Sequence, residues 1–140
     1  MAGMKSRALL LALLLVPTTV VGGCTKKYAA QTAEPALGGD AEIAIKKNKT
    51  QTYDIDIGVE NLPPAARLGK YAGYGVWVVA GETAPVKLGM LAYDEDKRTG
   101  DLTATTPFRT FELRVTLEPD AAATSPSNVV VVKQSVKAGK

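Results

Sequence analysis

The chain contains no histidine, and its 140 residues include a single cysteine, Cys24. The absence of histidine removes the commonest general base and the usual partner of a catalytic thiol. With one cysteine the chain can form no internal disulfide, so the folded part must be stabilised by its core. No run of basic residues is longer than two, and aromatic residues do not interleave with such runs. Nothing therefore predicts nucleic-acid binding.

The first 23 residues have the composition of an export signal. Lys5 and Arg7 precede an unbroken apolar run over 8–16, and small residues follow Pro17. The run is shorter than the ~20 residues that span a bilayer, and the proline interrupts it. We therefore predict a secretory signal peptide over 1–23 rather than a membrane helix. Its removal leaves 117 residues (140 − 23), enough for one domain, with 15 basic residues (17 − 2) against 14 acidic ones.

The signal ends in Val21-Gly22-Gly23-Cys24. This stretch resembles the lipobox of bacterial lipoproteins, in which an aliphatic residue and two small ones precede the cysteine that receives lipid. The resemblance implies cleavage between Gly23 and Cys24, a lipid on the Cys24 sulfur, and a place on the extracytoplasmic side of the bacterial cell envelope. The membrane would be the outer membrane if the cell has one, and otherwise the plasma membrane. A core thiol, a catalytic thiol and an ordinary signal cut elsewhere are the alternatives.

Residues 25–39 are small and polar and follow no sustained period. Together with the lipidated cysteine they predict a flexible tether over 24–39, followed by a folded domain over 40–140. A coil of this length would hold the domain roughly 20 Å from the lipid. Lys26 and Lys27 would then either contact anionic headgroups or serve as solvated linker charge.

Past Gly39 the apolar residues recur with the two-residue period of half-buried strands. The alternation is cleanest over 53–60 and 111–118, whereas 74–80 is apolar throughout, which is typical of a central strand covered on both sides. We expect strands at 41–47, 53–60, 74–80, 86–93, 101–105, 111–118 and 129–136. About seven short strands with no convincing amphipathic helix predict an all-β antiparallel two-sheet sandwich, immunoglobulin-like in plan. An open barrel is the alternative.

Several short motifs follow one another in this part of the chain. They are Leu62-Pro63-Pro64, Tyr74-Gly75-Val76-Trp77, Leu88-Gly89, the run from Phe111 to Pro119, and Ser125-Pro126. Their order resembles the extracytoplasmic C-terminal domain of RskA-type anti-sigma-K factors, over roughly residues 42–136. The resemblance implies a β-sandwich outside the membrane. It does not extend to the cytoplasmic segment with which that family binds a sigma factor, so sigma-factor binding is not implied.

Three sets of side chains are candidate sites. The acidic residues around Gly100 suggest a calcium loop, but Lys97 and Arg98 fall inside it and position 105 is threonine, which favours a solvated hairpin turn. These acidic residues are Asp94, Glu95, Asp96 and Asp101. Asp54 and Asp56 share the outward face of one strand, where a solubilising role is expected. Trp77 is expected to be buried, with stacking on a sugar or peptide as the alternative.

The sequence thus predicts a non-enzymatic, lipid-anchored envelope β-sandwich that acts as a structural, binding or sensory module. No cofactor and no metal is expected, and the expected partners are the membrane, through the lipid, and an envelope protein. A second hypothesis is a regulatory partner of a membrane anti-sigma factor system. A third is an envelope hydrolase that uses carboxylates.

Overall fold

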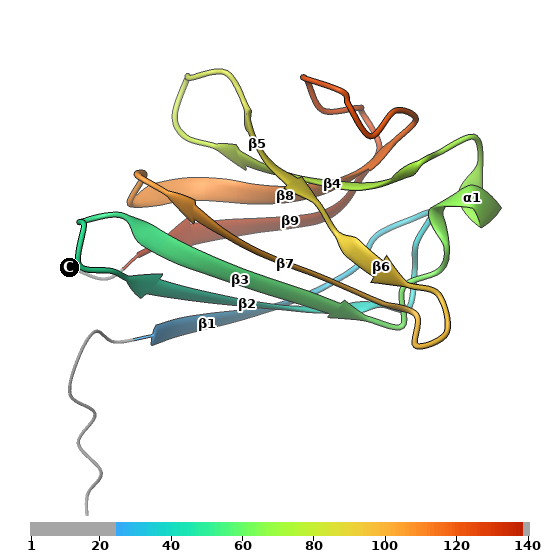
Figure 1. The fold of residues 1–140 in the computed structure, drawn as a ribbon, viewed down its shortest axis with the longest axis horizontal. Coiled ribbons are helices and arrows are strands. Elements are labelled where there is room, and N and C mark those ends of the chain that lie inside the picture. The colour runs from blue at the N-terminus through green and yellow to red at the C-terminus, as the bar shows by residue number, and fades with distance from the viewer. Residues whose placement is uncertain (1–24, 139–140) are drawn as a thin grey trace, which may run out of the picture.

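The alternating apolar residues of the sequence line the two inner faces of a sandwich. The computed structural model describes residues 25–138, and these residues form nine strands and one helical turn in two antiparallel sheets (Figure 1). The elements are β1 (Thr25–Gln31), β2 (Asp40–Lys47), β3 (Tyr53–Glu60), α1 (Ala65–Leu68), β4 (Gly73–Val79), β5 (Val86–Met90), β6 (Ala92–Asp94), β7 (Thr99–Thr106), β8 (Thr110–Glu118) and β9 (Val130–Lys137). The predicted all-β sandwich is confirmed.

The sheets follow an immunoglobulin-like order. The five-stranded sheet runs β1-β2-β3-β7-β6, and the four-stranded sheet runs β5-β4-β8-β9. If β2 is counted as the first strand of an immunoglobulin domain, β2-β3-β7-β6 and β4-β8-β9 reproduce its two sheets, with β5 added at one edge. β1 is then an extra strand at the opposite edge of the larger sheet.

The core lies between the two sheets. Every second side chain of β3 and of the first part of β8 is buried there, because successive side chains of a strand point to opposite faces. The main contributors are Ile43, Ile45, Tyr53, Ile55, Ile57, Val59, Tyr74, Val76, Val78, Phe111, Leu113, Val115, Leu117, Val132 and Val136.

All seven predicted strands are present, but the one expected at 86–93 is two strands. β5 pairs with β4 in one sheet, and β6 pairs with β7 in the other. Leu91 lies between them, is buried, and donates its backbone N–H to Tyr74 O at 2.9 Å. The chain therefore crosses from one sheet to the other at a single residue.

The predicted tether over 24–39 is wrong for the residues that the structure describes. Residues 25–31 form β1, which pairs with β2 from Thr25↔Lys46 to Gln31↔Asp40. The Tyr28 hydroxyl donates to Lys137 O at 3.1 Å and joins β1 to β9 of the other sheet. The sequence lacks a strand pattern here because an edge strand buries little, so lysines and alanines suffice. The domain thus includes residues 25–39 rather than starting at residue 40.

The remainder of the expected tether, residues 32–39, is an ordered turn. The N–H of Gly39 donates to Thr32 Oγ1 at 2.8 Å, and the Thr32 hydroxyl donates to Ala36 O. The N–H of Ala33 donates to Val131 O at 2.7 Å, which ties the turn to β9. These bonds satisfy backbone groups that a flexible linker would leave to water.

The sandwich has two distinct ends (Figure 1). The basal end comprises the start of β1, the end of β9 and the turns at 48–52, 80–85 and 107–109. The distal end comprises the segments 32–39, 61–72, 95–98 and 119–129. Within 25–138 no helix has the length and apolar character needed to cross a membrane.

Candidate functional site

The predicted lipidation site adjoins the basal end. The signal peptide over 1–23 and Cys24, with the expected cleavage after Gly23, lie outside the described residues. β1 begins at Thr25, the residue that follows Cys24, and neighbouring Cα atoms are about 3.8 Å apart. A lipid on Cys24 would therefore be joined to the sandwich without a spacer.

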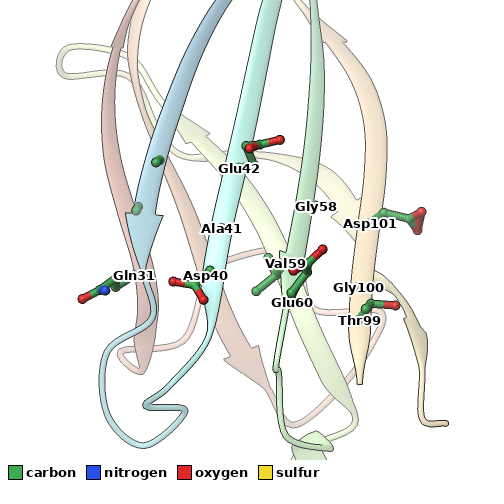
Figure 2. A pocket seen from close by; sticks show the side chains of 12 residues that line it. Gln31, Asp40, Ala41, Glu42, Gly58, Val59, Glu60, Thr99, Gly100 and Asp101 are labelled. Carbon is green, nitrogen blue, oxygen red and sulfur yellow. The ribbon is translucent and has the colours of Figure 1, made fainter. Parts of the chain in front are cut away.

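A shallow hollow lies on the outer face of the five-stranded sheet, toward the distal end (Figure 2). Its volume is about 510 Å³, and residues of β1, β2, β3 and β7 line it. Gly58 lies between Glu42 and Asp101 in the strand register, and a Cβ at Gly58 would meet no atom within 4 Å. Asp40 and Glu60 face each other across β2 and β3 nearby. The hollow is thus open at a glycine and bordered by four acidic side chains.

These four carboxylates are exposed and do not converge. Within 25–138 no three Asp, Glu, Cys or His side chains are grouped closely enough to hold a metal ion, and none of the four is in an ion pair with a basic side chain. The arrangement gathers negative charge on this face of the sheet.

The acidic run at 94–96 forms the predicted hairpin turn. Asp94 Oδ1 accepts the backbone N–H groups of Asp96 and Lys97 at 3.0 and 3.1 Å, and Arg98 has a positive φ of 57°. Asp101 lies on β7 and borders the hollow instead of joining this turn. Asp101 is therefore separated from the other three acids that suggested a calcium loop.

Asp54 and Asp56 lie on the outward face of β3, as predicted. Asp54 Oδ1 accepts the Asn48 side-chain N–H at 2.9 Å, and Asp56 Oδ1 accepts the Thr103 hydroxyl at 3.0 Å. The first bond closes the turn between β2 and β3, and the second links β3 to β7. Both carboxylates thus stabilise the sheet.

Trp77 is buried, as predicted, but it points away from the core between the sheets. Val76 and Val78 belong to that core, so Trp77 faces the outer side of the four-stranded sheet. There its Nε1–H donates to the Thr116 hydroxyl at 2.9 Å, and the Lys87 ammonium lies 5.6 Å from the ring centre. Lys87 also donates to Ala121 O and Ala123 O. The segment 119–129 therefore covers this face (Figure 1), and the ring is not available to stack on a ligand.

A buried carboxylate, which the sequence did not reveal, lies beside Trp77 on the outer face of the four-stranded sheet. Glu118 is 1% exposed and accepts the Thr116 hydroxyl and the Ser127 N–H, the latter at 3.0 Å. A Cβ at Gly75 would lie 2.9 Å from Trp77 Nε1 and 3.0 Å from Glu118 Cγ. Glycine at position 75 therefore allows the indole and the carboxylate to lie side by side. All partners of Glu118 are internal, which indicates a structural role.

Two tyrosines are hydrogen-bonded donors near α1. The hydroxyls of Tyr74 and Tyr93 donate to Pro63 O and Leu62 O, each at 2.6 Å, and their ring centres are 6.3 Å apart. Burial raises the pKa of Tyr74 well above its ordinary value, and Tyr93 adds to the effect. Burial also raises the pKa of Tyr93, against the opposing charge of Arg98. Both phenols thus stay protonated at neutral pH and hold the segment after β3 in place.

No family model matches the chain, and neither a curated protein nor a solved structure matches it.

Proposed function

We propose that the protein is a lipid-anchored, non-enzymatic β-sandwich of the bacterial cell envelope, held through Cys24 on the extracytoplasmic side and acting there as a structural or binding module. The observation that carries the proposal is that the lipobox-like motif directly precedes a paired strand. The motif Val21-Gly22-Gly23-Cys24 ends at Cys24, and the next residue, Thr25 of β1, already pairs with Lys46 of β2. A signal cut at that point would remove the leader and leave the domain intact.

The chemistry of the side chains supports a non-enzymatic role. The chain has no histidine to activate a nucleophile. The carboxylates of the acidic hollow are exposed, and the carboxylate of Glu118 has only internal hydrogen-bond partners. The acidic hollow, which Asp40, Glu42, Glu60 and Asp101 border, therefore offers negative charge to a partner, such as a basic segment of an envelope protein.

The way in which membranes release the protein tests this proposal. Two or three acyl chains bury enough methylene groups, at about 0.8 kcal/mol each, to hold a protein stably. We expect the protein to stay in the membrane pellet through about 1 M salt, where the Debye length is about 3 Å, and to be released by non-ionic detergent. Release by salt alone would show that charge, rather than lipid, holds the protein.

A further inference from the structure

The charges of residues 25–138 are segregated along the sandwich. Lys5, Arg7 and Lys140 lie outside this range, so 14 of the 17 basic residues remain, against 14 acidic ones. The described part is thus neutral in total. The strand register nevertheless places the two signs at opposite ends.

The basal end is basic. Seven basic residues lie there: Lys26, Lys27, Lys46, Lys47, Lys49, Arg109 and Lys137. Lys47 is half-buried, and the other six are exposed. Four acids lie at this end: Asp54, Asp56, Glu82 and Glu112. Asp54 accepts a hydrogen bond from Asn48. The basal end therefore carries a clear excess of positive charge.

The distal half is acidic. Its exposed carboxylates include the border of the hollow and the hairpin after β6: Glu34, Asp40, Glu42, Glu60, Asp94, Glu95, Asp96, Asp101 and Asp120. Against these nine acids stand four basic residues, Arg67, Lys70, Lys97 and Arg98. The sandwich is therefore an electrostatic dipole directed along its strands.

We propose that the basal end docks on anionic lipid headgroups of the leaflet that holds the anchor, so that the acidic hollow faces away from the membrane. This inference rests on the proposed anchor at Cys24. Because Thr25, the residue after Cys24, already belongs to the paired strand β1, an anchor on Cys24 holds the basal end close to the headgroups. The separation is then comparable to the Debye length of about 8 Å, so the charges are only partly screened. Anchoring makes the contact intramolecular, which raises its effective concentration. An anionic surface attracts the basal end and repels the distal half, so both ends favour the same orientation.

Fluorescence quenching by headgroup-spin-labelled lipid measures this orientation. The full-length lipidated protein would be reconstituted into vesicles of phosphatidylcholine and phosphatidylglycerol, with one fluorophore on Thr50→Cys in a basal turn or on Ala66→Cys in α1 at the distal end. Both positions are exposed. We expect severalfold stronger quenching of the basal label. The difference should vanish in phosphatidylcholine vesicles or in about 1 M salt, while the protein stays on the vesicles.

Two variants with the same change in total charge provide the control. The basal variant combines Lys46→Glu, Lys49→Glu and Arg109→Glu, and the distal variant combines Arg67→Glu, Lys70→Glu and Lys97→Glu. Each basic residue near an anionic leaflet strengthens binding by about fivefold. The basal variant should therefore reduce the docked population at least about tenfold, whereas the distal variant should keep the wild-type difference.

Equal quenching of the two labels in anionic vesicles would overturn the docking proposal. Equal losses in both variants would also overturn it, because the effect would then follow total charge. A basal label that responds to a soluble anionic polymer but not to anionic vesicles would assign this end to an envelope polymer instead. Unlipidated Cys24→Ser protein separates docking from anchoring: we expect it to sediment weakly, and only at low salt, with anionic vesicles. Its failure to do so would contradict docking whatever the state of the anchor.

Discussion

Replacing Cys24 with serine is expected to abolish incorporation of radiolabelled palmitate and to leave the protein without its lipid anchor. Serine is close to cysteine in size, so the export signal before it is nearly unchanged, but it lacks the sulfur that would accept the lipid. The variant should still be exported, and it should be either uncut after Gly23 or cut elsewhere and recovered in the soluble fraction. The expected effect is all-or-none because the acyl chains supply the stable part of membrane binding.

The neighbouring Thr25→Ser variant is the matched control. It leaves the candidate lipidation site intact and makes a conservative change in an exposed residue of β1, so it should label as the wild type does. Equal labelling of wild type and Cys24→Ser would show that the lipid is attached elsewhere, or not attached at all.

Replacing Trp77 with alanine is expected to lower the free energy of unfolding by about 3–5 kcal/mol, which is comparable to the whole stability of a marginal domain. The side chain is fully buried on the outer face of β4, beneath Lys87, which donates to Ala121 O and Ala123 O of the segment 119–129. Its loss leaves a cavity, removes the hydrogen bond to Thr116 and takes away the ring beneath Lys87. Chemical or thermal unfolding monitored by circular dichroism measures the effect.

Val86→Ala is the control for Trp77→Ala, because Val86 lies on the paired strand β5 and its side chain is 44% exposed. We expect this substitution to change the free energy of unfolding by no more than about 0.5 kcal/mol. A Trp77→Ala protein that unfolds as the wild type does would contradict the burial of the indole and its role in fixing the segment 119–129.

The parts of the fold that local patterns determine were predictable. Alternation over 53–60 and 111–118 indicates half-buried strands, and the apolar run over 74–80 indicates a strand covered on both sides. The structure has both features, including a covered outer face at Trp77. These predictions succeed because the period of the apolar residues within a strand indicates which of its faces are buried.

The features that escaped prediction depend on contacts between distant segments. β1 buries little, so its pairing with β2 and the bonds of Tyr28 to β9 leave no apolar period over 25–31. In the sequence Glu118 is the last residue of an alternating run and looks like an ordinary exposed acid. Its burial depends on the later segment that brings the Ser127 N–H to its carboxylate. The acidic hollow and the basic basal end arise from the register of four strands, which no single stretch of sequence specifies.

The account depends most on the lipid at Cys24, and the mass of the mature N-terminal peptide tests it directly. The protein purified from membranes with detergent would be digested with trypsin and its N-terminal peptide identified by tandem mass spectrometry. We predict a peptide that begins at Cys24, ends at Lys26 and carries a diacylglyceryl group on the sulfur. A membrane-derived protein whose N-terminal peptide contains an unmodified Cys24, or begins at another residue, would contradict the account.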